Sequence, residues 1–406
     1  MNLIYFTSSY PYGLGEQWKA NELNELINHF DNIIVVPYSY GGNHNNPKPL
    51  PKGVHLEGPL LPEEQLKSSK KDLLKIFLHK HRGTFLKEFI RKKVYTSKSR
   101  FISWFSSTLN VIRLLKHPLV QKLESNADKN TVFYFYWGKG SCEILPFINN
   151  RRLYKSFVRM HRYDLFEYEN NNYIPYRSAL LNSASVIAPS SLAGKQHLQQ
   201  LYPRVSANVE VFRCGTISNN KLSSASQDGI LRVVSCSLLS PVKRVHVMIE
   251  SLRHIQVPII WHHVGDGQLR DELETLARKL GVEDKFIFEG MMDSRRVLNF
   301  YTENSFDLFV NVSASEGVPF SIMEAFSVGI PVMATDVGGT GEIVNEQVGM
   351  LLPAEITGVV LAKKITDFYN LSTEQKQGMR RECYNQYIIN WNAEKLANAL
   401  AVFLKA

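Results

Sequence analysis

Apolar runs alternate with amphipathic segments along most of this chain. Short continuous apolar runs indicate buried strands, and apolar residues that recur every three or four positions indicate helices. The predicted strands are 2–6, 32–37, 131–136, 155–160, 184–188, 208–212, 231–236, 258–264, 285–288, 306–311 and 330–334. The predicted helices are 16–29, 191–201, 243–255, 267–280, 294–303, 319–328, 356–368 and 372–406. Alternation of this kind is typical of an α/β fold with parallel sheets.

The polar stretch 216–229 is rich in Ser and Asn and interrupts this alternation, so we interpret it as an interdomain linker. A chain of 406 residues is long enough to form two cores. The predicted domains are therefore 1–215 and 216–387, each with a Rossmann-like arrangement of strands and helices.

Two glutamates, Glu316 and Glu324, lie between the predicted strand 306–311 and the predicted strand 330–334. Glu316 would lie in the loop beyond the carboxyl end of the first strand, and Glu324 in the first turns of the following helix. A helix N-terminus offers unpaired N–H groups and a partial positive charge, which suits a diphosphate. The residues at this terminus are Gly317, Val318, Pro319, Phe320 and Ser321.

The two carboxylates would complete such a site. One that lies a turn or two into the helix can accept hydrogen bonds from a ribose diol, and one just before the helix can bind hydroxyls of an attached sugar. The alternative is an ordinary amphipathic helix with two incidental acids. The surrounding pattern G-V-P-F-S-x-x-E-A-x-x-x-G-x-P-V favours the binding site.

Lys243 and Arg244 are predicted at the start of the helix that follows strand 231–236. A cation there can neutralise a leaving diphosphate. The alternative is a solvated Lys-Arg pair at a helix start. A V-G-D-G sequence that includes Gly265 follows strand 258–264, and its glycines permit a tight turn near a ligand.

These motifs, in this order, resemble the retaining glycosyltransferases of family four, whose hallmark is an E-x7-E element on the GT-B fold. The resemblance is clear over 231–352 and looser over 1–215. It implies two Rossmann-like domains that face a central crevice, with a last helix, 388–406, that packs back on the first domain. It also implies that Glu316 contacts the transferred sugar, Glu324 the nucleotide ribose and Lys243 the diphosphate, and that Arg244, Gly265 and Met291 lie at the donor. The family usually has an arginine where this chain has Leu238.

In the first half, the resemblance implies a donor-side Gly15 and an acceptor-side Gly13 on the loop after strand 2–6. His161 is implied as a catalytic residue, with Arg159 and Asp164 on the acceptor side, although a lone histidine after a strand is more often structural. Gly138 and Gly140 would line the acceptor side. Glu16 and Glu22 would face the acceptor or lie on the helix surface.

The chain has a net charge of +9, which is concentrated in one place. Residues 66–122 carry 15 lysines and arginines and only two acids, Asp72 and Glu88. Helical spacing of apolar and aromatic residues within this basic helical insertion is typical of an element that lies on an anionic membrane. The alternative is a set of helices packed on the first domain with a solvated basic face. Nucleic acid is not an expected partner, because no known binding module is present.

The four cysteines are scattered, which predicts a reducing compartment. The first residues lack the basic region and the long apolar region that are typical of a signal peptide, and no run of about 18 apolar residues occurs, so neither a signal peptide nor a transmembrane helix is expected. The sequence also lacks a D-x-D motif, so neither a metal nor a cofactor is expected. We therefore predict a cytoplasmic, metal-independent retaining glycosyltransferase, with peripheral attachment to the inner face of the membrane as an option. It would move a sugar from a UDP- or GDP-sugar to a glycan or lipid-linked acceptor in capsule or lipopolysaccharide synthesis. The alternatives are a nucleotide-sugar epimerase or phosphorylase on the same fold, and a non-catalytic glycan-binding protein.

Overall fold

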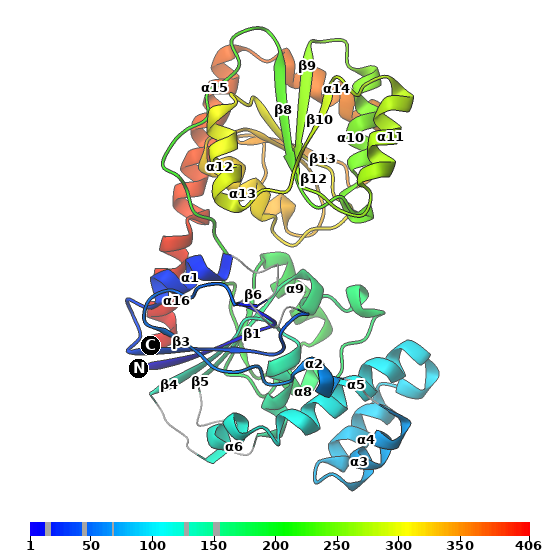
Figure 1. Cartoon of the computed structure of the whole chain (residues 1–406), viewed down its shortest axis with the longest axis vertical. Coiled ribbons are helices and arrows are strands. Elements are labelled where there is room, and N and C mark those ends of the chain that lie inside the picture. Colours follow the sequence, from blue (N-terminus) through cyan, green and yellow to red (C-terminus); the bar gives the residue numbers. More distant parts are fainter. Residues whose placement is uncertain (13–17, 43–46, 67–68, 126–129, 149–154) are drawn as a thin grey trace. The chain divides into compact units, whose positions relative to one another are not determined.

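The computed structural model describes residues 1–406 except 13–17, 43–46, 67–68, 126–129 and 149–154. The chain divides into two compact units (Figure 1). Unit 1 comprises Met1–Arg213 and Ala397–Ala406, and unit 2 comprises Cys214–Leu396. Each unit contains one parallel sheet with helices on its faces, so the predicted α/β class is confirmed.

Unit 1 is built on a seven-stranded sheet in the order β3-β2-β1-β4-β5-β6-β7, and every pairing is parallel. Its strands are β1 (Asn2–Thr7), β2 (Asn32–Pro37), β3 (Val54–Leu56), β4 (Thr131–Phe135), β5 (Lys155–Met160), β6 (Val186–Pro189) and β7 (Asn208–Val209). Its helices are α1 (Trp18–Leu26), α2 (Glu63–Leu66), α3 (Leu73–Leu78), α4 (Arg82–Arg91), α5 (Lys98–Leu114), α6 (Pro118–Ser125), α7 (Arg162–Leu165), α8 (Arg177–Leu181) and α9 (Leu192–Leu201).

The sheet of unit 1 has an apolar cluster on each face. One cluster includes Ile76, Phe85 and Trp104, which come from α3, α4 and α5 of the basic helical insertion. The indole N–H of Trp104 donates to the carbonyl oxygen of Phe85 at 3.3 Å, which joins α5 to α4. These helices are therefore anchored to the core of unit 1 by one side.

The opposite face is covered by α1 and by the last helix, α16 (Ala393–Lys405). Leu400, Ala401 and Leu404 of α16 are buried in the same cluster as Leu23 of α1. The C-terminal helix thus contributes to the core of unit 1, although it follows unit 2 in the sequence.

Unit 2 has a six-stranded parallel sheet in the order β10-β9-β8-β11-β12-β13. Its strands are β8 (Leu231–Cys236), β9 (Ile259–Val264), β10 (Phe286–Gly290), β11 (Leu308–Asn311), β12 (Val332–Thr335) and β13 (Gly349–Leu352). Its helices are α10 (Val245–Ser251), α11 (Arg270–Leu280), α12 (Ser294–Glu303), α13 (Phe320–Ser327), α14 (Gly358–Tyr369) and α15 (Thr373–Gln386).

Two strands were not expected from the sequence. β3 is only three residues long and its apolar residues are partly exposed, so it lacks the pattern of a buried strand. β13 begins at Gly349, where a Cβ atom would lie 1.8 Å from the carbonyl oxygen of Val332. Only glycine permits this close approach to β12, and a four-residue strand that starts with glycine gives little signal in the sequence.

The predicted helix 372–406 is also divided in two. α15 ends at Gln386 and is followed by a wide turn over Tyr387–Trp391, before α16 begins. The amide of Thr216 donates to the carbonyl oxygen of Trp391 at 2.9 Å, and the amide of Ala393 donates to the carbonyl oxygen of Thr216 at 3.0 Å. Thr216, in the expected linker, thus forms backbone hydrogen bonds with Trp391 and Ala393. A continuous helix would have paired these two backbone groups within itself.

Candidate active site

The segment from β11 to α13 places both glutamates of the E-x7-E pattern at one edge of the unit 2 sheet. β11 ends at Asn311, and Pro319 precedes the first turn of α13 with an extended backbone. Glu316 lies in the loop between them and Glu324 lies within the helix. Both are largely buried, with 8% and 7% of their surface exposed. Burial of two acids costs free energy unless each has partners, so their surroundings are informative.

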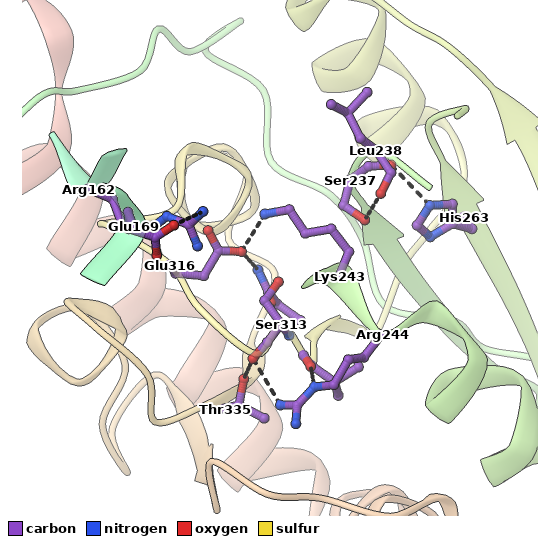
Figure 2. Close-up of polar contacts among 12 residues, drawn as sticks. Arg162, Glu169, Ser237, Leu238, Lys243, Arg244, His263, Ser313, Glu316 and Thr335 are labelled. Carbon is purple, nitrogen blue, oxygen red and sulfur yellow. Dashed lines mark hydrogen bonds and ion pairs between the residues drawn. The ribbon is translucent and has the colours of Figure 1, made fainter. Parts of the chain in front are cut away.

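Glu316 forms an ion pair with Lys243, as Figure 2 shows. The lysine Nζ atom donates to Oε1 of Glu316 at 2.6 Å, and the side-chain Nδ2 of Asn311 donates to the same oxygen at 3.2 Å. The backbone supports this contact, because the amide of Ala314 donates to the carbonyl oxygen of Val242 at 2.8 Å. The loop after β11 is therefore fastened to the turn that carries the lysine.

Arg244 lies beside this pair, but its guanidinium is directed at the backbone. It donates to the carbonyl oxygen of Ser313 at 2.9 Å (Figure 2). It also donates to the carbonyl oxygens of Val312 and Ala354, at 2.7 Å each. The residue itself has a left-handed backbone, with φ of 49°. Arg244 thus holds three loop carbonyls together, which gives it a positioning role. Its predicted contact with a donor stays a prediction.

The loop that contains Glu316 also packs against the Gly338-Gly339 pair. A Cβ atom on Gly338 would lie 1.9 Å from the carbonyl oxygen of Glu316, and φ of Gly338 is 58°. The amide of Gly339 donates to the carbonyl oxygen of Gly317 at 2.7 Å. These glycines let the loop after β12 lie directly against the backbone of Glu316.

A second close approach occurs between the loops after β8 and β9. A Cβ atom on Gly265 would lie 1.9 Å from the carbonyl oxygen of Ser237, and φ of Gly265 is 137°. The neighbouring Leu238 is 58% exposed, at the position where the resembled family usually has arginine. Met291, which follows β10, is also 58% exposed. Both side chains are thus accessible from outside unit 2.

Glu324 has an unusual electrostatic environment. Burial raises the pKa of its carboxyl to about 7, and a hydrogen bond with Ser294 opposes that rise only in part. The charge of Glu324 in turn contributes to the raised pKa of Cys236, which reaches about 12 mainly through burial. A carboxyl with a pKa near 7 is present in both protonation states at neutral pH, so it can donate or accept a hydrogen bond.

The other residues at the start of α13 are half-buried. Val318 and Phe320 pack against an apolar cluster of unit 2, and Ser321 lies in the first helical turn. Gly317 contributes a carbonyl oxygen to the contact with Gly339. The predicted anion site at this helix start stays a prediction.

In unit 1, Arg159 at the end of β5 is buried and pairs with Glu22 of α1. The distance between the guanidinium Nη1 and Oε2 of Glu22 is 2.5 Å. Glu22 also accepts from the hydroxyls of Tyr5 and Tyr134, at 3.0 and 2.8 Å. Glu22, whose side chain is 14% exposed, therefore joins α1 to the sheet, a role that neither of the two sequence interpretations contained.

Asp164 is fully buried next to the end of β5. Its carboxylate accepts hydrogen bonds from the backbone amides of Gly138 and His161, and burial raises its pKa to about 6. Arg177 donates to the carbonyl oxygens of Asp164 and Gly138. The geometry therefore gives Asp164 a role in positioning the backbone, and its predicted contact with an acceptor stays a prediction.

His161 lies between aromatic rings. Its ring centroid is 5.1 Å from that of Tyr136, with an interplanar angle of 23°, and 4.9 Å from that of Trp137. Burial, with the nearby charges of Arg159 and Lys19, holds its pKa well below the usual range, so the imidazole is neutral. Within the described part of the chain its buried Nε2 atom has no hydrogen-bond partner. A neutral imidazole with a free ring nitrogen is suited to a hydrogen bond with a ligand.

Lys19 was not expected at this site. It is completely buried in α1, and its ammonium lies 4.2 Å from the ring centroid of Tyr136 and 5.3 Å from that of Trp137. A lysine on an amphipathic helix is normally solvated, so the sequence contained no signal for its burial. The predicted site residues Gly13 and Gly15, and Glu16, lie outside the described residues.

A cavity of about 270 Å³ opens beside these rings, at the carboxyl ends of β1 and β4. Aromatic side chains dominate its walls, among them Tyr38, Trp137 and Tyr163. Lys139, which donates to the amide oxygen of Asn170 at 2.6 Å, is one of its polar residues. The hydroxyl of Ser141 also lines the cavity, and it is buried without a hydrogen-bond partner among the described residues. Such walls suit a small ring with hydroxyl groups.

Among the described residues, no group of three His, Cys, Asp or Glu side chains is arranged to hold a metal ion. No helix in the described ranges is both long enough and apolar enough to cross a membrane.

Comparison with known proteins finds a similarity in the second half of the chain. Residues 218–386 match the protein-family model for Glycosyl transferases group 1. The matched residues lie within unit 2.

Over 250 residues the chain is 27% identical to the putative colanic acid biosynthesis glycosyltransferase WcaL of Escherichia coli K12. This match covers 57% of the chain and 60% of WcaL, so the chain spans less than two thirds of that relative.

Two solved structures share the fold over the whole chain. One is the lipopolysaccharide outer core galactosyltransferase WaaB, with a TM-score of 0.68 and 15% identity over 100% of both chains. The other is HepE of Anabaena in complex with UDP and glucose, with a TM-score of 0.65 and 18% identity over 100% of both chains. The predicted GT-B architecture, with two Rossmann-like units, is therefore confirmed.

Proposed function

We propose that this protein is a retaining, metal-independent glycosyltransferase of family four. It transfers a sugar from a nucleotide-sugar to a glycan or lipid-linked glycan during synthesis of a surface polysaccharide. The observation that carries the proposal is the Lys243–Glu316 ion pair beside the first turn of α13. The glycosyltransferase group 1 match and the likeness to WcaL support it. The four free cysteines suit action in the cytoplasm.

The donor is held by unit 2 in this proposal. The diphosphate binds at the N-terminus of α13 and at Lys243, because both supply positive charge. The diphosphate then replaces Glu316 as the partner of the Lys243 ammonium group, and the freed Glu316 carboxylate binds hydroxyls of the donor sugar. Glu324 binds the ribose diol, for which a carboxyl with a pKa of about 7 has both donor and acceptor capacity. The structure of HepE was solved with UDP and glucose, which makes a UDP-sugar the first donor to test.

Transfer proceeds by front-face displacement. The bond between the anomeric carbon and the diphosphate oxygen breaks while the acceptor oxygen forms its bond on the same face, so the configuration is retained. The acceptor proton passes to the leaving diphosphate, which departs as the nucleoside diphosphate. Lys243 and the helix N-terminus stabilise the negative charge that develops on that leaving group.

The acceptor is held by unit 1 in this proposal. A terminal sugar of the acceptor occupies the aromatic cavity, with its ring against Trp137 or Tyr163 and a hydroxyl bound to Ser141. His161 offers its free Nε2 atom to a sugar hydroxyl, and its neutral state is maintained by burial. Arg159 and Asp164 position this region through their contacts with Glu22 and Gly138.

The first test is a thermal-shift screen with UDP, GDP, ADP and CMP and their common sugars. A nucleotide at a hundred times its Kd stabilises a folded protein by about 2.7 kcal/mol. We expect a clear shift with one nucleotide and loss of that shift in Glu324→Ala. The matching sugar should then pass from a radiolabelled donor to glycan or glycolipid acceptors with retention of configuration.

Leu238 gives one specific reason to test a non-catalytic role, because it occupies the position where the resembled family usually has arginine. A glycan-binding protein of this kind would bind glycans but never consume a donor. Product analysis also distinguishes an epimerase, which would convert the donor sugar without any acceptor. Donor turnover that depends on an acceptor would exclude both alternatives.

A further inference from the structure

Three consecutive helices of unit 1, α3 to α5, present large apolar side chains to the outside. These helices each bury one apolar side in the core of unit 1, so they are folded parts of the unit and not a loose appendage. Their other sides nevertheless carry exposed aliphatic and aromatic residues. The exposed fractions are 64% for Leu74, 71% for Leu78, 64% for Ile90 and 55% for Ile102, and Tyr95, in the turn between α4 and α5, is 62% exposed. Packing on unit 1 therefore accounts for only one side of these helices.

Spacing puts these residues among cations. Leu74 and Leu78 are one turn apart on α3, where Lys75 lies between them and is also exposed. Ile90 follows Lys87 by three residues on α4, and both are exposed. Residues three or four apart on a helix share a face, so each helix presents apolar and cationic groups together.

The two acids of the segment offset little of its charge, because Asp72 neutralises one cation, Lys75, among the 15 lysines and arginines of residues 66–122. Asp72 pairs with Lys75 at 2.6 Å and accepts from the backbone amide of Ser69 at 2.7 Å. Glu88 accepts from the hydroxyl of Tyr173 at 3.2 Å and from the backbone amide of Tyr176 at 3.1 Å. Both carboxylates thus serve local structure, and the remaining surface of the segment is cationic.

We propose that α3, α4 and α5 form a docking face for an anionic lipid bilayer. Exposed cations are attracted by acidic headgroups, and exposed aliphatic side chains insert into the boundary between headgroups and acyl chains. A polyanion in solution, such as an acidic glycan or a nucleic acid, would use the cations but would leave the leucines and isoleucine exposed to water. The combination of both features is what selects a lipid surface.

Docking on a bilayer does not depend on the proposed transfer reaction, but the role that we assign to docking rests on the proposed function. A lipid-linked acceptor lies at the surface of a bilayer, and the aromatic cavity belongs to the same unit as the docking face. An enzyme held at that surface would meet such an acceptor at a raised local concentration.

The test measures co-sedimentation of the full-length protein with vesicles. Wild type should bind vesicles that contain phosphatidylglycerol and should bind phosphatidylcholine vesicles much more weakly. In the variant Leu74→Ser/Leu78→Ser/Ile90→Ser, binding to the acidic vesicles should fall by about tenfold or more, because three apolar insertions are lost. Folding is checked by the thermal midpoint, which substitutions of exposed residues should change little.

A matched control replaces three exposed aliphatic residues elsewhere, in Val359→Ser/Ile389→Ser/Val402→Ser. This control should bind acidic vesicles as wild type does. The proposal is overturned if wild type does not bind acidic vesicles, or if the two triple variants bind acidic vesicles equally. It is also overturned if wild type is a dimer in light scattering and only the α3/α4 variant is a monomer, since the face would then bind a second copy of the chain.

The outcome is separable from that of the proposed function. Nucleotide-induced thermal shift in the α3/α4 triple variant should equal that of wild type, because the substituted residues belong to unit 1 and the proposed diphosphate and ribose contacts belong to unit 2. Vesicle binding without any sugar transfer would refute the proposed function and leave the docking face intact. Transfer to a water-soluble acceptor without vesicle binding would refute the docking face and leave the proposed function intact.

Discussion

The Nζ atom of Lys243 lies 2.6 Å from Oε1 of Glu316, although 73 residues separate them in the sequence. Their side chains are 24% and 10% exposed, so the contact is shielded from solvent. The pair joins the loop after β8 to the loop after β11, and both loops follow the carboxyl ends of adjacent strands. A ligand with a diphosphate and a sugar offers a new partner to each member.

Replacing Lys243 with methionine should leave transfer slower by about 10²–10³-fold, because one charge-stabilising contact at the leaving group is lost. The measurement is the single-turnover rate with a saturating donor. Lys363→Met, at an exposed position on α14, is the matched control and should react at the wild-type rate. A Lys243→Met rate close to that of wild type would remove the lysine from the mechanism.

Gly338→Ala should damage the site without changing any polar group. The added Cβ atom would meet the carbonyl oxygen of Glu316 at 1.9 Å, at a φ of 58° that disfavours alanine. The loop that carries Glu316 must therefore move, and we expect transfer to fall at least about tenfold. Gly281→Ala is the control, because φ there is a similar 64° but no atom lies within 4 Å of the added Cβ. Equal activity in the two variants would contradict the role of this close contact.

Much of the fold could be predicted because strands and helices alternate with clear periodicity, and because turns carry Gly and Pro. The E-x7-E loop could be located for the same reason, since Gly317 and Pro319 separate a buried strand from a helix. Parallel strands bring their carboxyl ends to one edge, which predicts a common site but not the partner of each side chain. The direct pairing of Lys243 with Glu316 therefore required the structure.

Buried charges were the least predictable feature. Glu22 lies on a helix where a surface acid is the normal expectation, and Lys19 lies on the same helix. Each is buried because an aromatic sheet face and Arg159 supply partners that are remote in sequence. Helical periodicity describes which residues share a face, but it does not show which charges find a partner on that face.

The Arg159–Glu22 pair should make a large contribution to the stability of unit 1. Removing one partner of a buried pair costs about 3–5 kcal/mol, because the other charge remains buried without compensation. Glu22→Gln and Arg159→Met should each lower the midpoint of urea denaturation strongly. The more exposed Lys195–Glu210 pair, at 3.5 Å and with side chains 25% and 46% exposed, supplies the control, and Glu210→Gln should cost at most about 1 kcal/mol. If Glu22→Gln and Glu210→Gln lower the free energy of unfolding equally, burial does not increase the contribution of the Arg159–Glu22 pair to stability.

Glu324 should make the stability of unit 2 fall as the pH rises. Burial raises the pKa of this carboxyl from 4.5 to about 7, so the folded protein retains a proton that the unfolded chain releases between those values. Stability from this group is therefore present below about pH 4.5, declines as the pH rises through that window and is lost above about pH 7. Glu324→Gln removes the ionisation, so its free energy of unfolding should increase relative to wild type by up to about 3 kcal/mol across the window. Urea denaturation of both proteins at about pH 5 and about pH 8 measures this difference. A difference that stays constant with pH would show that Glu324 is already ionised when buried, and that it can only accept hydrogen bonds from the ribose diol.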